Sequence, residues 1–381
     1  MLADYAVRVE QSRGRRHPER PHAYRNDFQR DRDRVIHSRA FRRLEAKTQV
    51  FTRRYSDHFR NRLTHTIEVA QIARTLAGQL GLNVDLVEAL ALVHDVGHPP
   101  FGHAGEKALN AAVREYGFCF DHNLHALRIV EDFELRYAAF RGLNLTFEVR
   151  EGIIKHSRDY SSNDYPELVE YMLDSQPPLE AQLIDLADEL AYTTADLDDG
   201  YEARLLTLEQ IRSGVPGFDD LYREAEKSYP AAIEKLLFNE ALKRVLDSWA
   251  GDLIGNTQTQ ISVARISSLS GVRACDHRLV SLGASVEDDR RKAKEFLYQN
   301  LYYSAALASE KSDAEQIIGD LFSLYVDDPT NLPTSYQQKA KQEPIARVVC
   351  DYIAGMTDNY IFEQYEKHGG KKPEMVLRPS P

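Results

Sequence analysis

The feature that most constrains the fold is a stretch at residues 84–96 that is apolar nearly all round. A helix with one apolar stripe lies at a surface, whereas a helix that is apolar on every side is buried. Gly97 and the pair Pro99–Pro100 follow the stretch and end it, because proline removes a backbone donor and restrains the residue before it. The sequence therefore predicts a central, fully buried helix.

Helical periodicity also dominates the rest of the chain. Residues 63–80 place apolar side chains three and four apart, and Gly81 follows where a helix stop is expected. Alternation typical of β-strands is weak and confined to residues 143–149 and 255–262. Residues 159–178 are expected to form a loop-rich insertion, and the tail from residue 369 is expected to fray. The predicted class is mainly α, with further helices at residues 104–116, 123–133, 180–197, 229–248, 288–310, 313–325 and 344–365.

Composition limits the cellular setting. No run of about 18 apolar residues is present, so no membrane-spanning helix is expected. The N-terminus has charge but lacks the apolar segment of a secretory signal. Cys119, Cys275 and Cys350 are widely spaced with no CxxC motif, which predicts buried or partly buried thiols in a reducing compartment. We therefore expect a soluble cytoplasmic protein.

Charge is distributed unevenly. The net charge is −11, yet residues 1–62 hold 16 Arg and 1 Lys against 8 acidic residues. Such a basic segment on an acidic protein can contact nucleic acid, a polyphosphate, or the protein's own acidic surface. The sequence alone leaves these alternatives open.

The pair His94–Asp95 stands at the end of the predicted buried helix. An ionised aspartate there is costly to desolvate unless it is paired or bound to a metal. Taken alone, the pair favours a structural explanation, with a capping aspartate and a hydrogen-bonded core histidine. His65 in the preceding helix and Asp188 in a later apolar helix add two ligands, and such a set suits a divalent ion with open positions for water and phosphate oxygens. Asp185, one turn before Asp188, is either a partner of this site or a solvated acid.

Further imidazoles and a carboxylate follow the pair. The segment HDVGHPPFGHAGE is difficult to explain by packing and contains His94, His98, His103 and Glu106. Histidine can donate to phosphate oxygens and protonate a leaving alkoxide. Glu106 comes three residues after His103 and can therefore orient its ring. His122 and His125 open the next predicted helix.

Seven blocks in order resemble the deoxyguanosinetriphosphate triphosphohydrolase family, a branch of the HD-domain phosphohydrolases. The blocks are FQRDRDRVIHSRAFRRLEAKTQVF (28–51), RNRLTHTIEVAQIAR (60–74), HDVGHPPFGHAGE (94–106), FDHNLHALRIV (120–130), EGIIKHS (151–157), LADELAYTTADLDDG (186–200) and RVVCDYIAGMTDNY (347–360). The resemblance implies an HD-domain helical fold with additional C-terminal helices, in a single domain over residues 1–381. Its HD core would span about residues 60–200. The basic segment 1–59 and a helical region 201–381 would pack on that core.

The resemblance also implies a metal and its ligands. The family's metal-binding positions fall here on His65, His94, Asp95 and Asp188, the same four residues assembled above. The cofactor implied is a divalent ion, Mn²⁺ or Mg²⁺ before iron, nickel or zinc.

Catalytic and phosphate-binding roles are carried over in the same way. His103 resembles the catalytic histidine near the α-phosphate, Glu106 its carboxylate partner, and His122 a second histidine of the catalytic pocket. Arg62 and His98 resemble phosphate contacts; the less favoured alternative for His98 is a loop histidine held by backbone.

Three residues resemble contacts to the nucleoside. Gln49 corresponds to a residue near the deoxyribose, Tyr192 to one that stacks on the nucleotide, and Asp196 to one that binds the 3′-hydroxyl. An aromatic residue at helical spacing is more often part of a core. The match weakens at residues 296–311, where Ser304 and nearby alanines replace an expected histidine and basic residue. Base preference and control by a second nucleotide depend on that segment.

The implied reaction converts a deoxynucleoside triphosphate and water into a deoxynucleoside and tripolyphosphate. Part of the basic N-terminal segment would then form one wall of the site. Relatives imply a homo-oligomer, a tetramer or hexamer. The alternatives are an HD phosphohydrolase of other specificity, such as a nucleotidase or phosphodiesterase, and a regulator that binds deoxynucleotides or single-stranded DNA.

Overall fold

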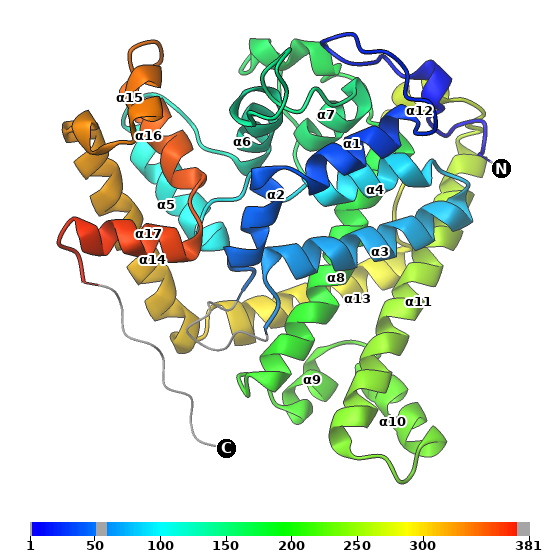
Figure 1. Cartoon of the computed structure of the whole chain (residues 1–381). Helices are drawn as coiled ribbons and strands as arrows, with labels where there is room; N and C mark the ends of the chain where they lie inside the picture. Colours follow the sequence, from blue (N-terminus) through cyan, green and yellow to red (C-terminus); the bar gives the residue numbers. More distant parts are fainter. Residues whose placement is uncertain (1, 51–58, 372–381) are drawn as a thin grey trace.

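The computed structural model describes residues 2–50 and 59–371, and within these ranges the chain is helical, with no β-strand (Figure 1). Two isolated bridges, Arg15 with Thr146 and Thr48 with Asn61, are the extended pairings that the described residues make. The predicted mainly α class is confirmed. Arg53 and Arg54 of the basic segment, and the tail from residue 372, lie outside the described residues.

The central helix is α4 (Val84–Val93), whose side chains are buried except in its first turn and at Glu88. It is surrounded by α1 (Asp27–Ile36), α3 (Arg62–Leu80), α7 (Phe147–Ile154) and α8 (Leu179–Glu202). The apolar stretch at 84–96 thus forms the buried helix that the sequence predicts, although the helix ends at Val93 and residues 94–97 form a turn.

Local signals fix where α3 begins and ends. Asn61 accepts a hydrogen bond from the backbone N–H of Thr64, whose side chain binds back to Asn61, so two unpaired donors of the first turn are satisfied. Gly81 ends the helix in the left-handed conformation, with φ of 67°, which costs glycine little. These two caps hold Arg62 and His65 in the first turn of α3.

A second cluster of buried apolar side chains, separate from the main core among the described residues, lies at the left of Figure 1. It is built from α5 (Gly102–Arg114), α14 (Ala305–Asp327), α16 (Ile345–Ala354) and α17 (Asp358–Lys367). The single-domain organisation over residues 1–381 stays a prediction.

Buried polar contacts join the chain just after α2 (Arg39–Arg43) to the rest of the molecule. The Lys47 ammonium donates to the backbone oxygens of His98 and Ala354, and burial lowers the pKa of Lys47 to about 7. Asp358 accepts hydrogen bonds from the backbone N–H groups of Thr48 and Phe101. Hydrogen bonds therefore connect the loop after α4 to the segment after α2 and to the junction between α16 and α17.

The remaining helices complete the framework, and α10 and α11 pack together at the lower edge of Figure 1. They are α2 (Arg39–Arg43), α6 (His122–Arg128), α9 (Leu208–Gly214), α10 (Phe218–Ser228), α11 (Glu234–Val263), α12 (Leu269–Arg273), α13 (Ala284–Leu297) and α15 (Thr334–Lys339). The short 3-10 helices are Val9–Gln11, Leu44–Ala46, Pro166–Tyr171 and Pro329–Asn331, and π-helical turns are formed by Ile129–Phe133 and Tyr298–Tyr302. The loop predicted at 159–178 is confirmed, with one 3-10 helix inside it.

Both β-strand candidates are wrong. Residues 143–149 enter α7, and Asn144, Thr146 and Glu148 are buried along with the apolar residues between them, so the alternation in sequence is not an alternation in burial. Residues 255–262 lie inside α11, where the buried Thr257 and Ile261 have helical spacing.

Several predicted helices have different bounds. The helix expected at 288–310 is divided: α13 ends at Leu297, a π-helical turn follows, and α14 begins at Ala305 and absorbs the helix expected at 313–325. The helix expected at 344–365 breaks between Ala354 and Asp358. The helix expected at 229–248 begins only at Glu234, after Pro230, and extends to Val263.

The basic N-terminal segment is largely neutralised by the protein's own acidic residues. Arg15 pairs with the fully buried Asp31, and Arg34 pairs with Glu19. The arginines of residues 1–62 that form ion pairs are Arg8, Arg15, Arg16, Arg25, Arg30, Arg32, Arg34, Arg60 and Arg62. Of the alternatives for this segment, the structure favours contact with the protein's own acidic surface.

Two expectations about cellular setting can be compared with the structure. Cys350 is buried and Cys275 is half-buried, as expected. Cys119 is exposed, so the expectation of a buried or partly buried thiol is wrong for this residue. Among the described helices, none combines the length and the apolar character needed to cross a membrane.

Candidate metal centre and active site

Four segments bring histidine and aspartate side chains together beside α4. The first turn of α3 supplies His65, the turn after α4 supplies His94 and Asp95, and the middle of α8 supplies Asp188. His156 joins them from the chain just after α7. The four predicted ligands therefore meet at one point, and a fifth candidate lies beside them.

The distances among the four predicted ligands fit a single ion. His65 Nε2 lies 2.8 Å from Asp188 Oδ1, and His94 Nε2 lies 3.8 Å from the same oxygen. His94 Nε2 is also 3.5 Å from Asp95 Oδ1. His94 Nδ1 lies 2.6 Å from the carbonyl oxygen of Ala91, which fixes the ring, while Nε2 is buried with no hydrogen-bond partner. A buried lone pair aimed at carboxylates and another imidazole fits a divalent cation.

The charge states of His94 and the two carboxylates also suit metal binding. Burial lowers the pKa of His94, which keeps the imidazole neutral and its lone pair free. Burial acts to raise the pKa of Asp188, but the hydrogen bond with His65 and the nearby imidazoles of His65, His94 and His156 together outweigh it, so the pKa falls below its usual range. For Asp95, burial is again opposed, here by Arg62, whose Nη1 lies 2.8 Å from Asp95 Oδ2, and the pKa is well below its usual value. Both carboxylates are therefore ionised.

A cavity of about 430 Å³ opens beside this cluster. Of the twelve site residues predicted from sequence, ten line it: Gln49, Arg62, His65, Asp95, His98, His103, His122, Asp188, Tyr192 and Asp196. The other two stand directly behind the lining. His94 reaches the metal cluster from the turn after α4, and Glu106 holds His122.

Glu106 lies between two histidines. Its Oε1 is 2.9 Å from His122 Nδ1 and its Oε2 is 3.7 Å from His103 Nδ1, so the closer partner is His122 and not the predicted His103. Burial would raise the pKa of Glu106, but the two histidines hold it far below its usual range. The ring of His98 stacks on His122 at 4.0 Å, and burial keeps the pKa of His98 well below its usual value. The His103 side chain is 83% exposed and so is free to approach a ligand.

The far side of the cavity carries tyrosines and lysines. Asp196 accepts a hydrogen bond from the hydroxyl of Tyr302, and burial raises the pKa of Asp196 to about 7. Lys294 lies 5.7 Å from the centre of the Tyr192 ring. Lys294 and Lys311 both line the cavity, so cations are present although Ser304 and its alanine neighbours replace the expected ones.

Several lining residues were not predicted from sequence. His156 falls in the block EGIIKHS, but a single histidine in a block gives no role. Tyr298 and Tyr302 stand four apart in sequence, a spacing more typical of a core. The charged residues among the others are Glu189, Lys294, Glu310 and Lys311.

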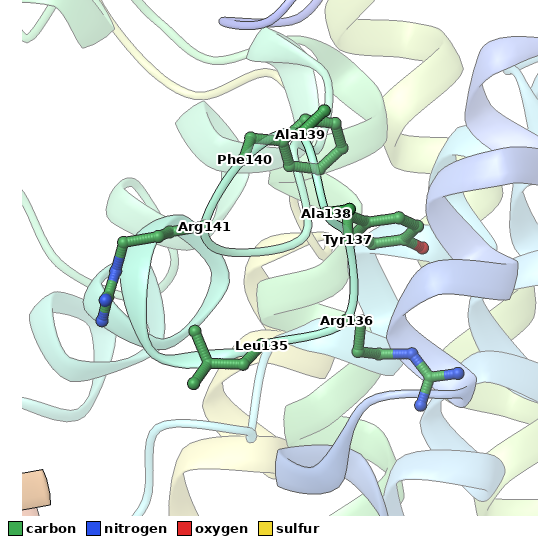
Figure 2. Close-up of a pocket in the computed structure, with 7 residues that line it drawn as sticks. All are labelled: Leu135, Arg136, Tyr137, Ala138, Ala139, Phe140 and Arg141. Carbon is green, nitrogen blue, oxygen red and sulfur yellow. The ribbon is translucent and has the colours of Figure 1, made fainter.

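A second hollow lies at the loop formed by residues 135–141. Figure 2 shows the side chains of Leu135, Arg136, Phe140 and Arg141 spread around this loop, without convergence on one point. The loop carries neither histidine nor carboxylate, the residue types that gather at the other cavity.

Known families and proteins match almost the whole chain. The family model described as "HD domain" matches residues 62–193, which includes all four predicted metal ligands, and that described as "Phosphohydrolase-associated domain" matches residues 280–367. Relatives named "Deoxyguanosinetriphosphate triphosphohydrolase-like protein" include one from Azoarcus sp. (strain BH72), 48% identical over 96% of this chain and 96% of its own length. Relatives of the same name from Ralstonia pickettii (strain 12J) and Geobacter sulfurreducens are 47% and 43% identical to this chain, respectively. Each alignment covers 96% of this chain and 94% of the relative. The chain therefore belongs to the HD-domain phosphohydrolases, within the family of deoxyguanosinetriphosphate triphosphohydrolase-like proteins.

Proposed function

We propose that this protein is a metal-dependent triphosphohydrolase that converts a deoxynucleoside triphosphate and water into a deoxynucleoside and tripolyphosphate. One observation carries the proposal: the two-histidine, two-aspartate cluster borders a cavity whose lining also holds Arg62, His98, His103 and His122. Its volume, about 430 Å³, falls within the range of small-molecule sites. The names of the relatives support the choice of substrate.

The metal centre lies beside the phosphate-binding part of the cavity. A divalent ion held by His65, His94, Asp95 and Asp188 would supply Lewis-acid chemistry toward a phosphate oxygen or the attacking water molecule. Mn²⁺ and Mg²⁺ are the proposed ions, because the two carboxylates suit hard divalent ions. Arg62 donates to Asp95 and also lines the cavity, so its guanidinium can neutralise charge on the same phosphate that the centre binds.

The leaving group requires a proton. When water attacks the α-phosphorus, the bond from phosphorus to the 5′-oxygen breaks, and the 5′-alkoxide leaves poorly unless it is protonated. His103 in its cationic form donates that proton, since its ring projects into the cavity and lies beside Glu106. Glu106 lies beside both rings, with Oε1 2.9 Å from His122 Nδ1 and Oε2 3.7 Å from His103 Nδ1, and so can orient them toward the phosphates.

The far side of the cavity holds the nucleoside in this proposal. Gln49 lies near the deoxyribose, Tyr192 stacks on the nucleotide, and Asp196 binds the 3′-hydroxyl. Lys294 and Lys311 add positive charge for a substrate with about four negative charges. We further propose a cytoplasmic homo-oligomer, a tetramer or hexamer, as implied by the resemblance to the family.

Two alternatives compete with this proposal. One is an HD phosphohydrolase of other specificity, a nucleotidase or phosphodiesterase, and it differs in its products. The other is a regulator that binds deoxynucleotides or single-stranded DNA. The ion pairs that neutralise much of the basic N-terminal segment weigh against DNA binding, because a phosphate backbone must then compete with internal carboxylates.

Product analysis tests the proposed function. The metal-stripped protein is reloaded with Mn²⁺ or Mg²⁺ and incubated with each deoxynucleoside triphosphate, singly and mixed, and chromatography separates nucleosides, nucleotides and tripolyphosphate. We expect nucleoside plus intact tripolyphosphate, and neither product from His94→Ala, which lacks a metal ligand. Monophosphate plus pyrophosphate would contradict the proposed leaving group. No turnover of any substrate would favour another phosphoester or a regulatory role.

A further inference from the structure

His156 occupies a place at the metal cluster that the resemblance to the family does not assign. Its side chain is buried and reaches the cavity from the chain just after α7. Its Nε2 lies 3.9 Å from Asp188 Oδ2, and its ring centre is 5.3 Å from that of His94. Donor atoms of His156, His94 and Asp188 all lie within 4.8 Å of one another.

Asp185 lies beside the ring of His156. His156 Nδ1 is 2.7 Å from Asp185 Oδ1, and that carboxylate accepts a hydrogen bond from the backbone N–H of Ser157 at 2.9 Å. Arg278 binds the other oxygen of Asp185 and donates to the carbonyl oxygen of Lys155 at 3.0 Å. The ring therefore lies with Nδ1 toward Asp185 and Nε2 toward the metal cluster, where Nε2 can act as a ligand.

Two of the three candidate donor groups among the described residues share His94 and cannot serve two separate ions; the third group, His98, His103 and Glu106, shares no residue with them. One of the two contains His65, His94 and Asp95, and the other contains His94, His156 and Asp188. His94 belongs to both, yet its Nδ1 is occupied by the carbonyl of Ala91, which leaves Nε2 as its one available donor. A single lone pair binds a single ion, so the two groups belong to one centre.

We propose that His156 is a fifth protein ligand of the metal ion, with Asp185 and Arg278 as positioning residues. The inference rests on the proposed metal centre but not on the substrate. Five protein donors exceed the four of a tetrahedral structural zinc site and leave one position of an octahedral ion for an oxygen of substrate or water. The site should therefore prefer six-coordinate ions such as Mn²⁺.

Metal titration without nucleotide tests the proposal. Mn²⁺ affinity and stoichiometry are measured by calorimetry on metal-stripped wild-type protein, His156→Ala, Asp185→Asn and His103→Ala. We expect one ion per chain, and a loss of affinity of about 10- to 100-fold for His156→Ala and about tenfold for Asp185→Asn. The matched control His103→Ala removes another histidine of the same cavity and should stay within about twofold of wild type.

A spectroscopic readout distinguishes a ligand from a neighbour. In pulsed electron paramagnetic resonance of the Mn²⁺-loaded protein, the nitrogen couplings should indicate three imidazoles in wild type and two in His156→Ala. Far-ultraviolet circular dichroism of the stripped variants shows whether they fold, and His156→Gln provides a second variant with a longer side chain. Unchanged Mn²⁺ affinity and couplings in a folded His156 variant, or two ions per wild-type chain, would overturn the proposal. Because no nucleotide is present, these results are independent of the product analysis.

Discussion

Gly97 provides a direct test of how the catalytic turn is packed. A Cβ atom at this position would lie 1.9 Å from the carbonyl oxygen of His122 and 2.5 Å from the backbone nitrogen of Ala126. Ordinary van der Waals contact begins near 3.4 Å, so Gly97→Ala requires a shift of about 1.5 Å between the turn and α6. Both contacts are to backbone, and no side-chain rotation relieves them.

The size of the effect follows from that displacement. Overpacking of this kind costs about 1–3 kcal/mol, and we expect the upper end because two backbone segments must separate. The turn carries His94, Asp95 and His98, while α6 begins with His122. A misplacement of about 1 Å in an active site lowers turnover about 100-fold. Gly97→Ala should therefore lose about 3 kcal/mol of unfolding free energy and at least about 100-fold in kcat.

Urea denaturation and turnover of the best substrate measure the two effects. Gly78→Ala is the matched control: it lies in α3, and a Cβ there has no atom within 4 Å. It should raise the unfolding free energy by about 0.5–1 kcal/mol, because alanine favours the helix, and leave kcat unchanged. If Gly97→Ala matches wild type in stability and kcat, the close approach of the turn to α6 is wrong.

Three other perturbations have defined outcomes. Lys47→Met leaves the carbonyls of His98 and Ala354 without their donor. It should lower the unfolding free energy in urea denaturation by about 2 kcal/mol and should also lower kcat. A variant as stable as wild type would contradict this expectation. The carboxyl of Asp196 titrates near pH 4 when unfolded and about 7 when folded, so wild-type protein loses stability as the pH rises between these values. The stability of Asp196→Asn relative to wild type should therefore increase by about 3 kcal/mol from pH 5 to pH 8, and a constant difference would refute it. Removal of the metal by a chelator should lower the unfolding free energy by about 2.7 kcal/mol, compared with protein whose metal is present at 100 times its dissociation constant. This loss is measured as a lower Tm. Asp188→Asn lacks a candidate ligand, so its Tm should change little on chelation.

The sequence predicted the metal cluster well because the signal is local and chemically specific. The apolar stretch before His94–Asp95 predicted the buried helix and the free-energy cost of burying an unpaired charge at the end of that helix. His65 lies in the capped first turn of the preceding helix, α3. His156 was missed for the opposite reason. Its proposed role depends on where α7 ends relative to α8. It also depends on Arg278, which is more than a hundred residues from His156 in the sequence and binds Asp185.

The far wall of the cavity was the least predictable part. A continuous helix was expected over residues 288–310, but a π-helical turn at Tyr298–Tyr302 interrupts it and turns Tyr302 toward Asp196. Such a turn adds one residue per hydrogen-bonded ring and leaves little trace in apolar periodicity. Lys294 precedes this interruption and Lys311 follows it, and no spacing rule in the sequence predicts that both line the cavity.

The division of the cavity between two stretches of chain has an evolutionary consequence. The candidate ligands all lie within residues 62–193, whereas much of the opposite wall comes from residues 294–311. Drift in the second stretch can reshape what the cavity accepts while selection holds the hydrolytic machinery constant. Lineages that share the same histidines and aspartates can therefore diverge in the substrate that they accept while each retains the same hydrolytic reaction.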